Sequence, residues 1–334
     1  MPVYYQPAEE LKEKVSPNTQ RVAWLFPQAD LLNPSNRLRR YQISKYLNGL
    51  SNINSENFYD YTRILDLRSQ LLNFDAIVFF NIGQFDQDLS RFLRDNKKII
   101  IFDHCENIFG LGCEDAVMEA SSAITCCSTA LANLTEKYLQ QKGLNQRIFV
   151  IRDPLDDLYP LPQAFINKDI ALVMGMGGNV QYVLPTLEPL CEKTGYKILI
   201  LTEPGLSFSS KHIYRVWSPY SWVEDACRCS VALCCHDVAH FPAKGNVKVT
   251  TPMSLGIPVI ASPVEAYKEA VDHLSTGYIA DRPEDWERGL LDLKNPDIKY
   301  PMGRDARQKA LANYSTEKIG LDYLIMLYYC KIYE

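Results

Sequence analysis

The sequence lacks several features that would place it in a specialised class of protein. Its 334 residues carry a formal net charge of −5, so it has no basic excess of the kind that nucleic-acid-binding surfaces usually show, and we expect no nucleic-acid partner. It has no run of about 20 apolar residues, which a membrane-spanning helix would need. The polar start of the chain has no apolar core of a signal peptide. We therefore expect a cytoplasmic protein whose ten cysteines are thiols.

The spacing of a metal site is also missing. Cysteines and histidines gather in one stretch, which holds Cys227, Cys229, Cys234, Cys235, His236 and His240. Their spacing, C-x-C-x4-C-C-H-x3-H, differs from that of zinc knuckles. Alternate residues of a strand also point to opposite faces of its sheet and do not converge on one ion. We expect no metal site, no obligatory cation and no cofactor.

What the sequence does contain is a series of short apolar runs separated by stretches of helical periodicity. The runs predict buried strands at 21–27, 75–80, 98–103, 122–128 and 148–154, and again at 170–173, 196–205, 230–236 and 258–262. Continuous apolar strands that alternate with helices are typical of parallel sheets covered on both faces. The sequence therefore predicts an α/β fold.

A proline-containing break in this alternation, at 156–169, predicts a linker between two domains. We expect a leader over 1–20, one Rossmann-like domain over 21–158, a second over 159–315 and a terminal helix over 316–334. Two such domains would face each other across a cleft. Ligands of open parallel sheets bind at the carboxyl ends of the strands, so this cleft is the expected site.

The stretch KGNVKVTTPMSLGIPVIAS has the composition of an anion-binding helix start. A helix N-terminus carries unpaired N–H groups and partial positive charge, and Lys244 and Lys248 would add full charges. We expect Thr250 or Thr251 to cap the helix and Pro252 to lie in its first turn. The pattern predicts a pocket for a phosphate or diphosphate. The alternative is an ordinary capped helix with solvated lysines.

A second anion candidate is MGMGGN, directly after the apolar run at 170–173. Glycines allow the backbone to approach a ligand closely. The spacing of Gly175, Gly177 and Gly178 does not complete a G-x-G-x-x-G motif, and no Gly-Lys-Ser/Thr follows. A tight turn between a strand and a helix explains the glycines equally well.

Three stretches together match a family pattern: KGNVKVTTPMSLGIPVIASPVEAYKEAV, GYIADRPEDWERGL and GRDARQKALANYS. The matching positions are Gly256, Pro258, Val259, Ser262, Glu269, Gly277, Trp286, Arg304, Arg307, Tyr314 and Ser315. This pattern resembles the donor-binding half of GT-B glycosyltransferases of the group-1, or GT4-like, kind. Upstream, IRDPLDDLYP and DACRCSVALCCHD fit the same family, so the resemblance spans nearly the whole chain.

The resemblance implies a nucleotide diphosphate sugar as donor substrate, held by the C-terminal half, with the acceptor held by the N-terminal half. The last helix would cross back to the N-terminal domain. Lys248, aided by Lys244, would neutralise the diphosphate and stabilise the leaving group.

The resemblance also assigns neighbours to the donor. Backbone amides of Gly177 and Gly178 would help to hold the diphosphate, with Asn179 near the phosphates or the sugar. Either Trp217 or Trp222 would stack on the base; both residues could instead serve only packing.

The chain departs from the family pattern at its two glutamates, because Ala243 and Thr251 occupy those positions. The usual carboxylate for the donor hydroxyls is therefore missing. Either Glu265 or Glu269 compensates, or the donor is held differently.

In the N-terminal half, KIIIFDHCEN places Asp103, His104 and Glu106 at the end of a predicted strand. The family frequently has a histidine here that faces the sugar. His104 would orient a donor or acceptor hydroxyl, or act as a general base whose charge is tuned by Asp103 or Glu106. The alternative is an ordinary polar turn.

The segment PSNRLRR stands where the family often has a glycine-rich loop. Asn36, Arg37 and Arg40 lie in this loop and the helix after it. Arg37 would meet an acidic acceptor or the donor phosphate, or else lie on a solvated helix face.

The expected function is transfer of a sugar from a nucleotide diphosphate sugar to an acceptor hydroxyl, in glycan, polysaccharide or glycoconjugate biosynthesis. One alternative is a sugar-nucleotide epimerase of the same fold. Another is a catalytically degenerate partner subunit that binds nucleotide or glycan. The tyrosine-rich end LDYLIMLYYCKIYE also leaves open a peripheral membrane surface or a partner-binding surface.

Overall fold

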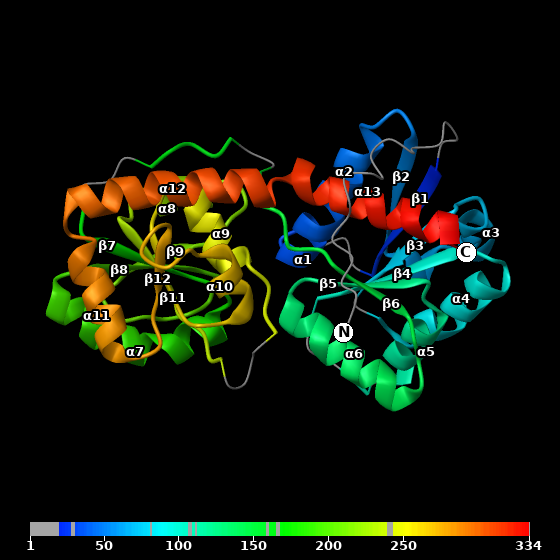
Figure 1. The fold of residues 1–334 in the computed structure, drawn as a ribbon, viewed down its shortest axis with the longest axis horizontal. Coiled ribbons are helices and arrows are strands. Elements are labelled where there is room, and N and C mark those ends of the chain that lie inside the picture. Colours follow the sequence, from blue (N-terminus) through cyan, green and yellow to red (C-terminus); the bar gives the residue numbers. More distant parts are fainter. Residues whose placement is uncertain are drawn as a thin grey trace. The chain divides into compact units, whose positions relative to one another are not determined.

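The chain folds into two compact units, Met1–Pro154 with Thr316–Glu334, and Leu155–Ser315. The structure is a computed structural model, and it describes residues 20–27, 31–80, 82–105, 109–110, 112–157, 160–164, 168–238 and 243–333. The first unit ends a few residues before the boundary expected from the sequence. The terminal helix α13 (Thr316–Tyr333) is grouped with the first unit, and Figure 1 shows the elements of both.

The first unit contains a parallel six-stranded sheet in the order β2-β1-β3-β4-β5-β6. Its strands are β1 (Gln20–Phe26), β2 (Ile53–Tyr59), β3 (Ala76–Phe79), β4 (Ile99–His104), β5 (Ala123–Cys126) and β6 (Arg147–Val150). Its other helical segments are α1 (Pro34–Asn36), the π-helix η2 (Arg37–Gln42), α2 (Ile43–Asn48), the 3₁₀-helix η3 (Tyr61–Arg63), α3 (Leu67–Leu71), α4 (Gln84–Asp95), α5 (Gly112–Ala120) and α6 (Thr129–Lys142).

One face of this sheet is covered by α2 and α13. Alternate residues of the strands, such as Trp24 and Ile101, pack in one cluster with Ile43 of α2 and with Tyr323 and Leu327 of α13. The apolar, tyrosine-rich composition of α13 is thus explained by packing on its own sheet. Within the described parts of the chain, we find no helix with the length and apolarity that a bilayer crossing requires.

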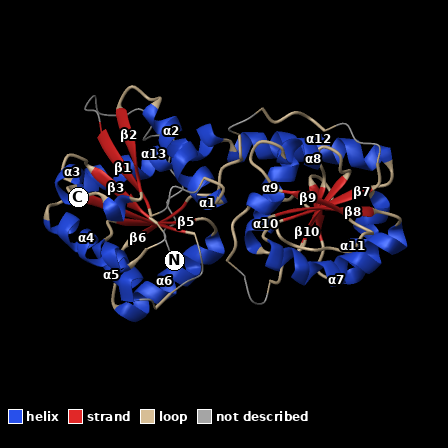
Figure 2. Cartoon of the chain, turned by 180° about the vertical axis from the view of Figure 1, so that it is seen from behind, coloured by secondary structure: helices blue, strands red, loops and turns tan. Residues whose placement is uncertain are grey.

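The second unit contains another parallel six-stranded sheet, in the order β12-β11-β10-β7-β8-β9. Its strands are β7 (Ile170–Met174), β8 (Lys197–Thr202), β9 (Ile213–Val216), β10 (Val231–Cys234), β11 (Val259–Ala261) and β12 (Gly277–Ile279). Its helices are α7 (Gly177–Thr194), α8 (Trp222–Ala226), α9 (Val247–Ser254), α10 (Glu265–Ala270), α11 (Pro283–Asp292) and α12 (Pro296–Tyr314). Figure 2 shows that helices lie on both sides of each sheet.

The inner strands of the second sheet are buried on both faces because their alternate residues enter two different cores. Leu172 of β7 packs in a cluster with residues of α9 and α12. Its neighbours Ala171 and Val173 pack in the other cluster, with residues of α7 and α11. Burial on both faces is what makes the strand sequences continuously apolar. The predicted α/β fold with two parallel sheets is confirmed.

The sequence did not predict three of the strands, β2, β9 and β12, and all three lie at the edges of their sheets. The sequence of β2, INSENFY, alternates buried and exposed positions over its first four residues, whereas inner strands such as β3 are buried throughout. An edge strand has one neighbour instead of two, so its sequence need not be continuously apolar.

Candidate active site

The second sheet has a topological switch point between β7 and β10. These strands are hydrogen-bonded neighbours, yet the chain continues from β7 toward β8 and β9, and from β10 in the opposite direction toward β11 and β12. The loops that follow the two strands therefore diverge at this point. Open α/β sheets bind ligands in the crevice so formed at the carboxyl ends of the strands.

The loop after β7 is short and leads directly into α7. The helix begins at Gly177, and no side chain among the described residues caps its first turn at Met176. A Cβ atom added to Gly177 would overlap the side chain of Leu206, whereas one added to the exposed Gly178 would meet nothing within 4 Å. A methyl group at Gly177 would therefore force Leu206 to move, whereas Gly178 leaves open space beside the helix N-terminus. Asn179 lies in the same first turn and is half-buried.

Lys248 joins the two loops of the switch point. It lies on α9, and its Nζ atom donates to the carbonyl oxygen of Cys235, directly after β10, at 2.9 Å. A Cβ atom on Gly175, after β7, would lie 3.8 Å from the same Nζ atom. Burial lowers the pKa of Lys248. The ammonium group is thus held at the switch point, close to the glycine loop.

The start of α9 differs from the expectation that Thr250 or Thr251 caps the helix. The helix begins at Val247, with Asn246 as its N-cap, and Pro252 lies inside it. A proline inside a helix leaves the carbonyl four residues earlier without its N–H partner. Here that carbonyl belongs to Lys248, and the thiol of Cys234 donates to it at 3.1 Å. This contact from β10 explains how the helix continues through Pro252.

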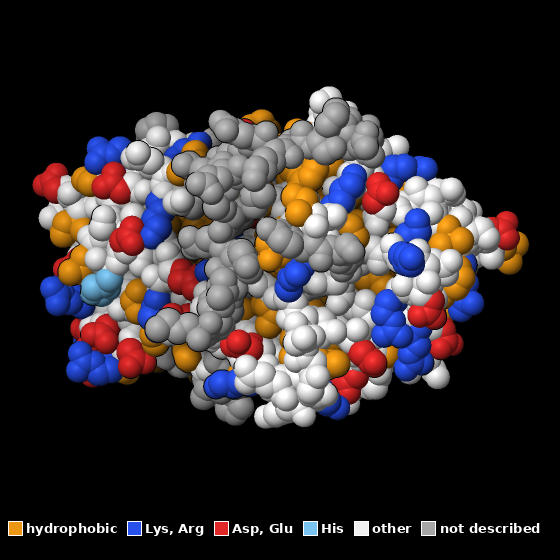
Figure 3. All heavy atoms as spheres, turned by 45° about the vertical axis from the view of Figure 1, so that its right-hand side comes forward, with side chains coloured by type: hydrophobic (Ala, Val, Ile, Leu, Met, Phe, Trp, Pro, Cys, Tyr) orange, Lys and Arg blue, Asp and Glu red, His pale blue; other side chains and the backbone are white. Residues whose placement is uncertain are grey.

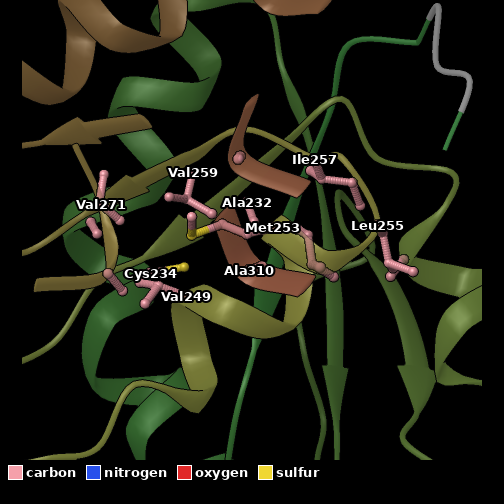
Figure 4. Close-up of a cluster of buried hydrophobic side chains, with 14 of the residues drawn as sticks. Ala232, Cys234, Val249, Met253, Leu255, Ile257, Val259, Val271 and Ala310 are labelled. Carbon is pink, nitrogen blue, oxygen red and sulfur yellow. The ribbon is translucent and has the colours of Figure 1, made fainter. Parts of the chain in front are cut away.

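The other face of α9 fixes the helix on the sheet. Figure 4 shows Val249 and Met253 of α9 in one apolar cluster with Cys234 of β10 and Val259 of β11. The helix ends as expected at Gly256, whose φ of 76° is the left-handed conformation that glycine adopts without strain. Because the apolar face is anchored in this way, Lys248 is positioned by the core.

Sequence analysis missed His236 as part of this site. It follows β10, and its backbone N–H donates to Ser262 Oγ at 2.9 Å. Burial, and then the positive charges of Lys248 and Lys244, lower the pKa of His236 to about 4. The imidazole is therefore neutral near pH 7, and the two lysines are the cations near it.

Sequence analysis also missed Glu203, at the end of β8. A Cβ atom on Gly177 would lie 3.0 Å from Glu203 Oε1, so this carboxylate stands beside the start of α7. The family position occupied by Thr251 carries no carboxylate, and Thr251 is buried within α9. Glu203 is the acidic group that the fold places next to the glycine loop.

The two glutamates expected to compensate lie on α10. Glu265 is exposed and forms an ion pair with Lys268 at 2.7 Å. Glu269 is half-buried, and its carbonyl oxygen accepts from Lys309 Nζ at 3.3 Å. Neither contact involves the glycine loop or Lys248.

The two tryptophans differ in their environment. Trp222 begins α8 and is 2% exposed in the core of the second unit, so its ring is not available to a base. Trp217 follows β9, where its backbone N–H donates to the carbonyl of Thr202 at 2.7 Å. Its ring is partly buried against the same core. Of the two tryptophans, Trp217 is thus the one whose side chain is partly exposed.

In the first unit, Asp103 and His104 point to opposite faces of β4. Asp103 is fully buried and accepts from Arg39, from Thr125 Oγ1 at 2.5 Å and from Tyr323 at 3.1 Å. Burial would raise the pKa of Asp103, but the charge of Arg39 and these hydrogen bonds hold it below its usual range. The carboxylate is thus committed to this network.

His104 ends β4 on the other face, between the rings of Phe102 and Phe109, at centroid distances of 5.2 and 5.1 Å. Its Nε2 atom is buried with no hydrogen-bond partner in the described structure. Burial lowers its pKa to about 4, against the attraction of Asp103. The imidazole is neutral near pH 7. Glu106, the other expected tuning group, lies outside the described residues.

The remaining predicted residues of the first unit lie at the start of its first helices. Asn36 ends α1 and is buried. Arg37 is also buried, and its Nη1 atom donates to the carbonyl oxygens of Leu31 and Leu32 at 2.7 and 3.2 Å. Arg37 therefore lies in the interior and holds the segment that precedes α1.

The described residues contain no group of three or more histidine, cysteine or acidic side chains that could hold a metal ion. One Asp-x-Asp pattern, Asp86-Gln87-Asp88, occurs in α4. Asp86 is buried there and accepts from Tyr61 Oη at 2.6 Å and from the backbone of Gly83 at 2.7 Å. On the face in Figure 3, basic and acidic side chains are interspersed over the described atoms.

No protein-family profile matches this sequence, and neither does any curated protein sequence. Solved structures do match. HepE of Anabaena, in complex with UDP and glucose, is 12% identical with a TM-score of 0.63, over 92% of this chain and 99% of that chain. Sucrose-phosphate synthase of Thermosynechococcus elongatus is 13% identical with a TM-score of 0.59, over 93% and 98%.

TarM of S. aureus, in complex with Fondaparinux, alpha-GlcNAc-glycerol and UDP, is 14% identical with a TM-score of 0.59, over 77% of this chain. The match spans 57% of the TarM chain, little more than half of its length. At these identities the likeness is one of fold. The GT-B fold predicted from the sequence is confirmed.

Proposed function

We propose that this chain is a glycosyltransferase that moves a sugar from a nucleotide diphosphate sugar to an acceptor hydroxyl, in glycan, polysaccharide or glycoconjugate biosynthesis. The observation that carries the proposal is the position of Lys248. Its ammonium group lies at the switch point of the second sheet, beside Gly175 and bonded to the carbonyl of Cys235. The GT-B neighbours HepE and TarM have UDP in their complexes.

The second unit is proposed to hold the donor. Lys248 and Lys244 would neutralise the diphosphate, and backbone amides of Gly177 and Gly178 at the start of α7 would donate to its oxygens. As the bond from the sugar to the diphosphate breaks, negative charge grows on the leaving phosphate. A fixed cation stabilises that charge more strongly in a partly buried site than in water.

The remaining donor contacts follow from position. Asn179 would contact the phosphates or the sugar. Trp217 would stack on the base, since it keeps exposed surface at the end of β9. We propose Glu203 for donor hydroxyls, because its carboxylate lies beside Gly177, whereas Thr251 is buried within α9.

The first unit is proposed to hold the acceptor. His104 would orient a hydroxyl of the reacting sugars, with Asn36 and Glu106 in the same acceptor-side role. Because its pKa is lowered to about 4, the imidazole of His104 is neutral near pH 7. We propose that it donates or accepts a hydrogen bond, and that it does not act as a general base. Asp103 would support β4 through Arg39.

Lys248 would supply the positive charge that a divalent cation supplies in other transferases. We therefore propose a metal-independent reaction and expect turnover to persist in a chelator. We also propose a cytoplasmic protein, a location supported by ten cysteines that are present as thiols.

The test is incubation with a panel of nucleotide diphosphate sugars, with and without sugar acceptors, while free nucleoside diphosphate and sugar product are measured. A transferase releases one nucleoside diphosphate for each glycosylated product. Interconversion of two donor sugars without net release would identify an epimerase. Donor binding without any conversion would identify a nucleotide-binding partner subunit.

A further inference from the structure

Arg40 is a buried cation that has no hydrogen-bond acceptor among the described residues. Its side chain lies on the π-helix η2 and is 0% exposed. All three nitrogens of the guanidinium group lack a hydrogen-bond partner in the described structure. Burial lowers its pKa to about 9, against the attraction of Asp103. A guanidinium group carries five N–H donors, and leaving them unmet in the interior is costly.

The neighbouring Arg39 has the acceptors that Arg40 lacks among the described residues. Arg39 is also buried, but it binds Asp103 through two nitrogens, with the shorter contact at 2.7 Å, and Asp153 at 2.9 Å. It also donates to the carbonyl of Ile151 at 2.9 Å. The nearby carboxylates are thus committed to Arg39. Of these carboxylates, Asp103 attracts Arg40 through its charge, without a hydrogen bond to it.

The position of Arg40 is that of a ligand-binding residue. The first sheet has its switch point between β1 and β3, since the chain leads from β1 outward to β2 and then from β3 in the other direction. Arg40 lies over the ring of Phe80, directly after β3, at 3.3 Å, and 5.2 Å from the ring of Phe26, which ends β1. The guanidinium group therefore stands at the carboxyl ends of the two diverging strands.

We propose that Arg40 binds an oxyanion, a carboxylate or a phosphate, that is part of the acceptor substrate. The assignment to the acceptor rests on the proposed glycosyl transfer; the anion site itself rests on the contacts of Arg40. The flat faces of Phe80 and Phe26 hold the guanidinium plane, which leaves its N–H fork for a two-point contact with an oxyanion. Arg40, rather than Arg37, is then the residue that selects an acidic acceptor.

The test compares three sugars that differ in charge: glucose, glucuronate and glucose 6-phosphate. Binding is measured by NMR titration for the wild type and two variants. Arg40→Met keeps most of the side-chain volume and removes the charge. Arg40→Lys keeps the charge and removes the paired N–H donors of the guanidinium group. Arg68→Met is the matched control, because Arg68 is exposed and stacks on Phe92 at 5.2 Å. Nucleoside diphosphate binding and the melting temperature are followed on the same preparations.

The expected result is that at least one charged sugar binds the wild type more tightly than glucose does. Arg40→Met should lose this preference by about tenfold to a hundredfold, with Arg40→Lys in between and Arg68→Met unchanged. Tighter binding of glucuronate would identify the anion as a carboxylate, and tighter binding of glucose 6-phosphate would identify it as a phosphate. Without ligand, Arg40→Met should melt at the same temperature or higher, because an uncompensated buried charge has been removed.

Equal binding of all three sugars to the wild type would overturn the proposal. So would a preference that Arg40→Met retains, or a ligand-free Arg40→Met protein that melts well below the wild type, since that would assign Arg40 to the fold. The proposed glycosyl transfer has its own test: it is wrong if no nucleoside diphosphate binds to the protein or is released from a donor. Preference for a charged sugar through Arg40 without nucleotide binding would support the anion site alone.

Discussion

The two sheets have the same parallel architecture, and each has its switch point between two adjacent strands, but they carry different chemistry there. In the second sheet, the cation is a lysine bonded to a single carbonyl, next to glycines and a helix N-terminus. In the first sheet, it is a buried arginine that lies over two aromatic rings. The same topology thus places different side chains at the two switch points.

The largest expected effect is on turnover, and it comes from a residue of the first unit. His104→Ala should reduce turnover by about 10²- to 10⁴-fold if the neutral imidazole orients a reacting hydroxyl. Nucleoside diphosphate affinity should hardly change, because the donor is proposed to bind the second unit. Steady-state kinetics and a nucleotide titration on one preparation separate the two effects. A variant with a lower melting temperature but normal turnover per folded molecule would make His104 a structural residue.

Stability should distinguish the two adjacent arginines. Arg39→Met leaves Asp103 and Asp153 buried without their partner, so we expect a loss of about 3 to 5 kcal/mol in the free energy of unfolding. Arg40→Met should cause no such loss. Denaturant unfolding of both variants gives the comparison, and a similar loss in both would mean that Arg40 also stabilises the fold.

The buried histidine also predicts a pH dependence. The pKa of His104 falls from 6.5 to about 4 on folding, so the unfolded chain binds the extra proton between these values. The free energy of unfolding should therefore fall as the pH drops from 6.5 toward 4, by up to about 3 kcal/mol from this residue. The measurement is denaturant unfolding at several pH values. His104→Gln should reduce the slope by the part that His104 contributes, and the part from His236, whose pKa is also lowered to about 4, should remain. An unchanged slope would contradict the buried, neutral state of His104.

The smallest effect is expected at the glycine loop. Gly178→Ala adds a methyl group in open space on the first turn of α7, and alanine is the better helix former, so stability should rise by up to about 1 kcal/mol. Gly177→Ala should lower stability, since its Cβ would overlap Leu206. Thermal unfolding of the two variants tests the pair, and equal shifts would contradict the packing described here.

The sequence predicts the inner strands of both sheets because burial on both faces makes them continuously apolar. It does not predict the edge strands β2, β9 and β12, whose composition is less restricted. The start of α9 is another difference, since Thr-Thr-Pro is typical of a helix start. The helix runs through Pro252 because the thiol of Cys234, 14 positions earlier than Lys248, donates to the freed carbonyl. Such a contact depends on the tertiary fold.

The candidate site is predictable to a similar extent. The glycine loop follows from its place directly after a predicted strand, and Lys248 follows from the composition of the stretch that begins α9. His236 and Glu203 could have been noticed by the same criterion, since both lie just after a strand. The choice between Arg37 and Arg40 could not be made from sequence. It depends on Arg37 being bonded to two carbonyls. Arg39 binds Asp103 and Asp153, and Arg40 has no acceptor among the described residues.

The central claim is that the switch point of the second sheet binds a diphosphate through Lys248. The most direct measurement is calorimetric titration of nucleoside diphosphates and the matching nucleosides into the wild type, Lys248→Met and the exposed control Lys268→Met. We expect the wild type and the control to bind a diphosphate much more tightly than its nucleoside. Lys248→Met should lose about tenfold to a hundredfold in diphosphate affinity and keep its fold. Equal diphosphate affinity in Lys248→Met and the wild type would contradict the account.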